Sequence, residues 1–208
     1  MIEVWYIRHG ESEANAGLAT ENPPEVALTE IGHDQAYKAS FAFERSPTLI
    51  VTSKYTRAMQ TAQYTINRFP SVPVETWDVH EFTYLSYAVI GKTTMQERWP
   101  VVQAYWERND PGYIHGEGAE SFEGFTCRIR KLEEKIVAKD GQFIAIFCHG
   151  FVMKMILWAH LLGSFDAVTM SNFLRFYRSF DIANGAIFRG EYRPNATLFS
   201  GLMTNHLK

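Results

Sequence analysis

Two stretches decide the fold of this chain: residues 2–10, IEVWYIRHG, and residues 142–150, QFIAIFCHG. Each is a short apolar run that ends in a His-Gly pair. Apolar runs of this length predict buried strands, and the polar residues after them predict loops at an edge of the sheet. We therefore expect two strands that bring His9 and His149 to the ends of a common sheet.

Strand and helix patterns alternate along the rest of the chain. Helices are predicted from a cap at Thr29 to about Arg45, from a cap at Ser53 to Phe69, over 122–136 and over 151–162. Further strands are predicted over 48–52, 72–79 and 179–188. This order predicts an α/β fold, a three-layer α/β/α arrangement with helices on both faces of a mainly parallel central sheet.

The stretch 82–118 interrupts this alternation. It is irregular and rich in Tyr and Trp, and no clear strand–helix unit can be assigned within it. We expect one domain, residues 1–208, in which 82–118 forms an inserted lobe over one end of the sheet.

Composition limits the classes of protein to which the chain can belong. Its 208 residues are 46% hydrophobic and 21% charged, which excludes a disordered or collagen-like chain. The chain has 20 Lys and Arg and 23 Asp and Glu, so we do not expect the large basic surface that nucleic-acid binding needs. Met1–Ile7 carries an acid where a leader peptide would carry bases, and no apolar run is long enough to span a membrane. A cytoplasmic protein with neither nucleic-acid nor membrane partners is expected.

The two cysteines, Cys127 and Cys148, are too few for a disulfide scaffold. Cys148 lies in an apolar run and Cys127 in a helical pattern, so both are expected to be reduced, buried thiols. Homo-oligomerisation is possible, and the sequence does not decide it.

Polar residues follow the predicted strands at four places. They are Arg8-His9-Gly10, Ser53 leading to Arg57, His80-Glu81 and His149-Gly150. Ligands of open α/β sheets bind at the carboxyl ends of the strands, so these side chains are expected to converge on one site.

The convergent residue types suit one kind of chemistry. Two arginines offer planar forks of donors that match phosphate oxygens and neutralise a dianion without a metal. Nearby positive charge keeps an imidazole neutral and hence nucleophilic, while a carboxyl group can protonate a leaving alcohol. The pattern predicts phosphoryl transfer through a phosphohistidine, with no metal and no cofactor.

Four motifs carry a family resemblance. Residues 8–15, RHGESEAN, resemble the Arg-His-Gly signature of the histidine phosphatase superfamily, the phosphoglycerate-mutase-like proteins. Residues 28–36, LTEIGHDQA, and 53–62, SKYTRAMQTA, are similar to two further signatures of that family, and His149-Gly150 is similar to its second His-Gly. The resemblance covers about Ile2 to Met153 and implies the phosphoglycerate-mutase-like fold.

The resemblance also implies roles for individual residues. His9 would be the phosphorylated nucleophile, Glu81 the general acid, and the phosphoryl oxygens would be held by Arg8, Arg57 and His149. Asn15 and Ser12 would line the substrate pocket.

The sequence departs from the family pattern at two places. Phe151 replaces the second glycine that often follows His-Gly, and residues 82–85, FTYL, replace a Gly-x-Trp-Glu-Gly pattern that often follows the acid. Asp78 and Glu75 therefore remain alternatives to Glu81 as the general acid.

The charge of the lobe bears on the substrate. From Glu81 to Glu123 there are seven acids against three bases, Lys92, Arg98 and Arg108. A site for a polyanion should be ringed by cations, so we predict a phosphomonoesterase for a small, singly phosphorylated metabolite. The alternatives are a phosphoglycerate mutase, a catalytically idle module that binds a phosphorylated ligand, and phosphoryl transfer to an acceptor other than water.

Overall fold

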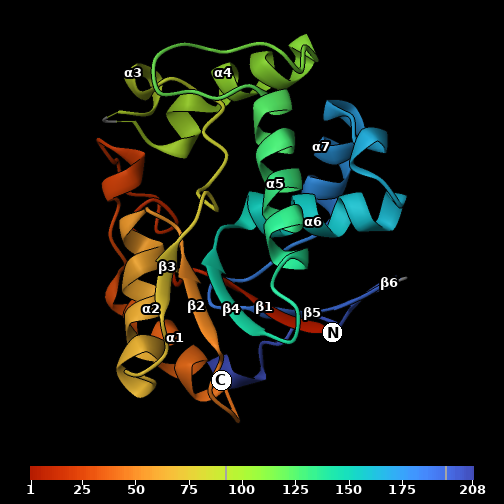
Figure 1. Cartoon of the computed structure of the whole chain (residues 1–208). Helices are drawn as coiled ribbons and strands as arrows, with labels where there is room; N and C mark the ends of the chain where they lie inside the picture. Colours follow the sequence, from red (N-terminus) through yellow and green to blue (C-terminus); the bar gives the residue numbers. More distant parts are fainter. Residues whose placement is uncertain (92, 195) are drawn as a thin grey trace.

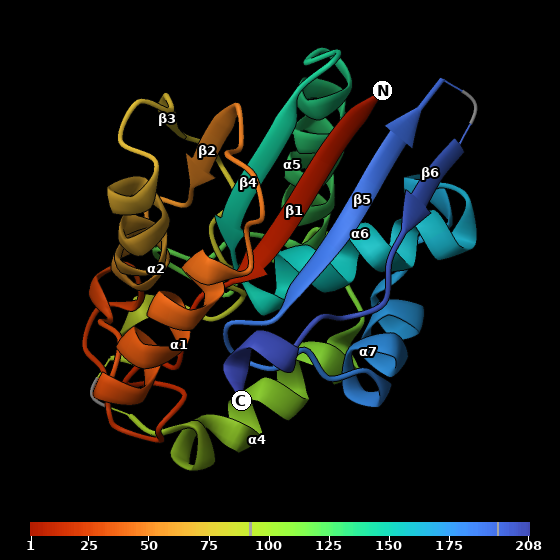
Figure 2. The ribbon, with the colours of Figure 1, turned by 90° about the horizontal axis from the view of Figure 1, so that it is seen from below.

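The computed structural model describes residues 1–91, 93–194 and 196–208 (Figure 1). Within these residues six strands form a sheet in the order β3-β2-β4-β1-β5-β6 (Figure 2). The strands are β1 (Ile2–Arg8), β2 (Leu49–Thr52), β3 (Val74–Thr76), β4 (Phe143–Cys148), β5 (Ile187–Arg193) and β6 (Ala196–Phe199). The pairs β1–β4, β4–β2 and β2–β3 are parallel, whereas β5 and β6 run antiparallel. The predicted mainly parallel sheet is confirmed.

Helices cover both faces of this sheet. They are α1 (Glu30–Phe41), α2 (Thr56–Arg68), α3 (Tyr87–Ile90), α4 (Met95–Arg108), α5 (Phe122–Val137), α6 (Gly150–Leu162) and α7 (Met170–Ser179). Short 3₁₀ segments lie at Pro23–Glu25, Phe165–Ala167 and Asn205–Leu207. Within the described residues, none of these helices is long and apolar enough to cross a membrane.

Alternate residues of each central strand point to opposite faces of the sheet and pack with the helices there. On β1, Trp5 and Ile7 pack with α1 and α2, while Val4 and Tyr6 join the core that α5 and α6 cover. Strands buried on both faces are apolar at successive positions, as β1 and β4 are. The three-layer α/β/α fold follows from this pattern.

Parallel pairing brings the motif residues together. Arg8 lies opposite Cys148, and Thr52 lies opposite Phe147. His9, Ser53 and His149 are the next residues of their chains, so they leave the sheet side by side at its carboxyl edge.

Two predicted strands had the wrong extent. The strand expected over 72–79 is only three residues long, because β3 is an edge strand that pairs with β2 alone and the chain then turns away. The strand expected over 179–188 is wrong: α7 ends at Ser179, and β5 begins only at Ile187. Gly185, with φ of 75°, turns the chain between these two elements.

Two helix ends and one cysteine also differ from expectation. The first helix stops at Phe41 instead of Arg45, and the second begins at Thr56, after Ser53 and not directly at it. Cys148 is buried in β4 as expected, but Cys127 is exposed. Cys127 lies on α5 outside the buried stripe, because residues two positions apart on a helix face different directions.

The stretch 82–118 forms α3, α4 and their connections, which lie above the sheet and α5 in Figure 1. Its aromatic side chains pack mainly inward, and Tyr105 and Trp106 are buried in the same core as Phe122 of α5. Thr94 and Glu97 form a capping box that starts α4. These contacts hold the lobe in place beside the carboxyl edge of the sheet.

Candidate active site

His9 follows β1 directly and is 3% exposed. The carbonyl oxygen of Gly10 lies 2.7 Å from Nδ1 of His9, and Nε of Arg57 donates to Nε2 of His9 at 3.2 Å. A carbonyl can only accept and a guanidinium can only donate, so the proton of the neutral ring is assigned to Nδ1. The lone pair of His9 is thus on Nε2, beside Arg57.

The surroundings of His9 keep its ring neutral. Burial lowers the pKa of His9 well below its usual range, and Arg57 and Arg8 lower it further, while the Gly10 carbonyl opposes them. An imidazole that is neutral at physiological pH retains its nucleophilic lone pair.

Two guanidinium groups flank this ring. Arg57, in the first turn of α2, is buried and donates from NH1 to the carbonyl oxygen of Pro23 at 2.7 Å. Arg8, at the end of β1, donates from NH1 to the carbonyl oxygen of Ile182. Its Nε is buried and has no hydrogen-bond partner in the part of the chain that the structure describes. A buried donor of this kind is suited to the oxygen of an anionic ligand.

His149 lies next to His9, and the centroids of the two rings are 5.0 Å apart. Its Nε2 is 2.9 Å from Oγ of Ser53, and its Nδ1 is buried with no partner among the described residues. Burial lowers the pKa of His149 well below its usual range, and Arg57 adds to this effect. The sequence placed Ser53 at a strand end and as a helix cap but gave it no partner, whereas in the structure it contacts His149.

Arg8, His9 and Arg57 meet a cavity of about 230 Å³ between the sheet edge and the lobe, whereas His149 is fully buried and does not line it. Arg8, His9, Arg57 and Glu81 lie in its wall. The rest of the wall is largely apolar or aromatic and comes from several segments: Val26, Phe82, Tyr84, Leu85, Ile90, Met95, Phe151 and Tyr177. The cavity therefore combines a cationic patch with an apolar wall, as small-molecule sites commonly do.

Glu81 is the carboxylate that faces this cavity. Its Oε1 accepts hydrogen bonds from the backbone N–H groups of Phe82 at 3.2 Å and Phe151 at 3.1 Å. Burial raises the pKa of Glu81 above its usual range, although Arg57 and Arg8 act in the opposite direction. Phe151, which departs from the family pattern, thus binds the carboxylate through its backbone.

The two alternative acids lie elsewhere. Asp78 is exposed and lines a different cavity, on the side of Lys131 and Lys135. Glu75 is on β3, where its carboxylate accepts from Nε1 of Trp77 at 2.7 Å. Neither lines the cavity that holds His9.

The loop after β1 carries Ser12 and Asn15, and both line the cavity. Oγ of Ser12 donates to Oδ1 of Asn15 at 3.0 Å. Nδ2 of Asn184 donates to the same oxygen at 3.0 Å and to the backbone carbonyl of His9 at 3.1 Å. Sequence reasoning missed Asn184, because its only signal is the Asn-Gly pair of a turn.

The charges counted in the lobe do not all face the cavity. Within the described residues, Glu81 is the one acid and Arg98 the one lobe base that line it. Arg108 instead packs over the ring of Tyr113, with its Cζ 4.0 Å from the ring centroid. Lys92 lies outside the described residues. The excess of acids therefore lies outside the cavity, and only the scarcity of bases applies to the cavity.

Comparison with known proteins places these motifs in a family. A profile of the histidine phosphatase superfamily (branch 1) matches residues 4–197. The adenosylcobalamin/alpha-ribazole phosphatase of Salmonella typhi is 26% identical over 165 residues, which are 78% of this chain and 80% of that protein. The 2,3-bisphosphoglycerate-dependent phosphoglycerate mutase 2 of Latilactobacillus sakei is also 26% identical, over 72% of this chain and 80% of the mutase.

A solved structure resembles the whole chain. The phosphoserine phosphatase of Entamoeba histolytica, in complex with 3-phosphoglyceric acid, superposes with a TM-score of 0.75 at 19% identity and covers 100% of both chains. That likeness supports the phosphoglycerate-mutase-like fold. With the family profile spanning most of its length, the chain belongs to branch 1 of the histidine phosphatase superfamily.

Proposed function

We propose that this protein is a metal-independent phosphomonoesterase that hydrolyses a small phosphorylated metabolite through a phosphohistidine. The observation that carries the proposal is the geometry at His9: a neutral, buried ring whose Nε2 lone pair lies 3.2 Å from Nε of Arg57. A phosphoryl group bound by Arg57 and Arg8 would lie against that lone pair. The two guanidinium groups would supply the charge stabilisation that a metal supplies in other phosphatases.

The residues of the cavity account for both steps. The Nε2 lone pair of His9 attacks phosphorus while the P–O bond to the alcohol breaks, and protonated Glu81 gives its proton to the departing oxygen. The Glu81 carboxylate then takes a proton from a water molecule whose oxygen attacks phosphorus. The P–N bond breaks, inorganic phosphate leaves, and neutral His9 and protonated Glu81 are restored.

The two main alternatives are judged by the charges in the cavity. A phosphoglycerate mutase needs cations for a second phosphoryl group, but Arg98 is the one lobe base lining the described cavity. An idle binding module would not need a carboxyl group with a raised pKa beside the phosphate site, as Glu81 is. Similar identities to a phosphatase and to a mutase do not separate these functions, so the preference for hydrolysis rests on the cavity.

Labelling tests the nucleophile. Enzyme mixed with a ³²P-labelled phosphomonoester and quenched in base should carry a label on His9, and the label should be lost when the sample is acidified. His9→Ala should remove both label and turnover, and product analysis should find inorganic phosphate. Vanadate should inhibit competitively, and excess chelator should leave the rate unchanged. A label on Ser12, transfer without phosphate release, or loss of activity on chelation would contradict the proposal.

The general acid is tested by the leaving group. Glu81→Gln should slow single-turnover phosphorylation by an alkyl phosphate by about 10²–10⁴-fold, because an alkoxide needs a proton to leave. Nitrophenyl phosphate should be affected much less, because nitrophenolate leaves without one. Asp78→Asn, at the exposed alternative position, serves as the control and should leave both rates unchanged.

A further inference from the structure

Glu81 lies in a segment without regular secondary structure, between the end of β3 at Thr76 and the start of α3 at Tyr87. A general acid must stay aligned with the leaving oxygen, so this segment needs support from outside. The support comes from Arg128 of α5, which contacts the segment and does not line the cavity.

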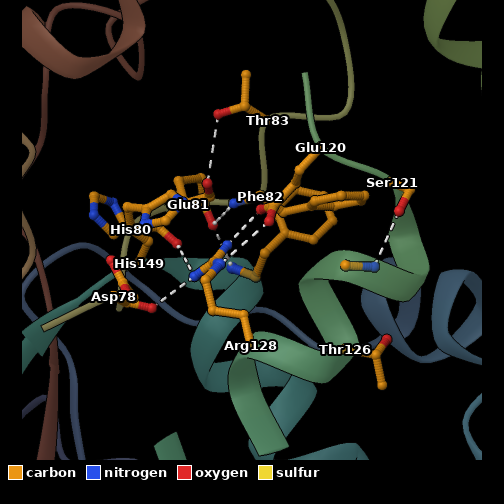
Figure 3. A network of polar contacts seen from close by, with 12 residues as sticks. Asp78, His80, Glu81, Phe82, Thr83, Glu120, Ser121, Thr126, Arg128 and His149 are labelled. Atoms are coloured by element: carbon orange, nitrogen blue, oxygen red, sulfur yellow. Dashed lines mark hydrogen bonds and ion pairs between the residues drawn. The ribbon is translucent and has the colours of Figure 1, made fainter. Parts of the chain in front are cut away.

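Arg128 of α5 forms hydrogen bonds to the part of this segment that precedes Glu81. Its NH1 donates to the backbone carbonyl oxygens of Asp78 and His80, each at 2.9 Å (Figure 3). The side chain of Arg128 is 12% exposed. Its bond to the His80 carbonyl is partly buried, whereas its bond to the Asp78 carbonyl lies at the surface. One guanidinium nitrogen therefore fixes two carbonyl groups that flank Val79.

Glu120 adds a second support for the segment, and we refer to Arg128 and Glu120 together as the frame. Nε of Arg128 donates to Oε2 of Glu120 at 3.2 Å, and NH2 of Arg128 pairs with Oε1 (Figure 3). The backbone N–H of Glu120 donates to the carbonyl oxygen of Thr83 at 2.9 Å. The Arg128–Glu120 pair thus holds the segment on both sides of Glu81, at His80 and at Thr83.

We propose that Arg128 and Glu120 are positioning residues for the general acid: they hold the 78–83 segment so that the Glu81 carboxyl group reaches the leaving oxygen. The frame fixes the backbone of this segment, and the N–H groups of Phe82 and Phe151 fix the carboxylate itself. The inference rests on the proposed function, because positioning matters only if Glu81 donates a proton. Neither Arg128 nor Glu120 lines the cavity that holds His9, so neither touches the substrate.

The test uses single-turnover phosphorylation with an alkyl phosphate and with nitrophenyl phosphate. Arg128→Ala should slow the alkyl phosphate by about 10–10²-fold, since misplacing a reacting group by about 1 Å costs this much. The nitrophenyl phosphate rate should change less than about threefold, because that reaction does not need the acid. Vanadate inhibition should stay unchanged, since Arg8 and Arg57 remain in place.

Arg130→Ala is the matched control. Arg130 lies one half-turn further along α5, is 45% exposed and pairs with exposed Asp166, so its loss should alter neither rate. Arg128→Lys and Glu120→Gln act as milder variants if the alanine variant folds poorly. A lysine keeps the charge without the planar fork, so it should recover only part of the alkyl phosphate rate.

A double variant separates positioning from general damage. In a Glu81→Gln background, Arg128→Ala or Arg128→Lys should add little further loss, because the group that Arg128 positions is already disabled. Equal slowing of both substrates, or a full additional loss in that background, would overturn the inference. If Glu81→Gln itself shows no dependence on the leaving group, the proposed acid fails, which is a different result from failure of the frame.

Discussion

At the scale of single residues, the loop that carries His9 depends on a contact between two glycines. A Cβ atom on Gly10 would lie 2.2 Å from the carbonyl oxygen of Gly32, and one on Gly32 would lie 1.9 Å from that of Glu11. Real Cβ atoms do not approach backbone oxygens so closely, so the loop after β1 and the first turn of α1 meet backbone to backbone. This contact fixes the peptide whose carbonyl orients the His9 ring.

Gly10→Ala should therefore weaken both stability and catalysis. Pushing the two backbones apart should lower the free energy of unfolding by about 1–3 kcal/mol, as overpacking does, and should lower kcat/KM by displacing the His9 loop. Gly201→Ala is the control, because a Cβ there has no neighbour within 4 Å and the change should be near neutral. Urea unfolding and steady-state kinetics of the two variants measure the difference; equal stabilities would refute the contact.

At the scale of elements, α4 determines which charged side chain the lobe contributes to the cavity. Arg98, in its first turns, donates from Nε to the Thr94 carbonyl and from NH2 to the Thr93 carbonyl, both at 3.2 Å. Because the capping box fixes this end of α4, the guanidinium is held in the cavity wall. It adds a third cationic group to the cavity, after Arg8 and Arg57, and would suit an alcohol that carries one anionic group.

Arg98→Gln should raise KM for phosphomonoesters with a carboxylate on the alcohol, such as phosphoserine, by about tenfold or more, the value of one hydrogen bond to a charged group. KM for nitrophenyl phosphate should stay within about threefold, since that substrate has no carboxylate. Arg108→Gln controls for the lost charge, because Arg108 stacks on Tyr113 outside the cavity. A uniform rise in KM for both substrates would show that Arg98 does not discriminate between them.

At the scale of the whole molecule, the site makes stability depend on pH. Burial lowers the pKa of His9 and His149 well below the usual range, and burial with Arg128 and Lys54 lowers that of His80 to about 3. These rings stay neutral in the folded protein while their unfolded counterparts bind protons below about pH 6.5. Stability is therefore fully present above that pH and falls as the pH is lowered towards the folded values. Glu81, whose pKa is raised, changes the free energy of unfolding with pH in the opposite direction, but it is one group against the three histidines.

The free energy of unfolding should consequently decrease between pH 7 and pH 5. Each buried neutral histidine contributes a slope of up to about 1.4 kcal/mol per pH unit, and part-exposed His80 contributes less. His80→Gln should make the decrease shallower, whereas His33→Gln, at a half-buried site beside Tyr64, should retain it. Urea titrations at several pH values provide the measurement, and a flat profile in the unsubstituted protein would exclude buried neutral histidines.

The order of strand and helix patterns was enough to predict the layers of this protein and several of the residues that meet at the carboxyl edge of its sheet. Alternating patterns of period two and 3.6 depend on local residue order, so β1, β4, α5 and α6 were predictable to within a few residues. The convergence of His9 and His149 at strand ends, and of Arg57 in the helix that follows β2, was predictable because parallel strands present their carboxyl ends at one edge. Local patterns did not predict the bounds of two strands, because these bounds depend on contacts with distant parts of the chain. The strand β3 is short because it is an edge strand. The strand β5 begins later than predicted because the Asn184-Gly185 turn precedes it.

The contacts among the site residues could be known only from the folded chain. Glu81 lines the cavity with His9 and Asp78 does not, because the two residues face different sides of one loop, and no spacing in the sequence encodes that direction. The contacts of Ser53, Asn184 and Arg128 join segments 48–175 positions apart, so they arise from packing and not from local order. The charge count of the lobe includes acids that lie outside the cavity, because composition adds all charges, whereas a bound substrate would contact only the charges in the cavity wall.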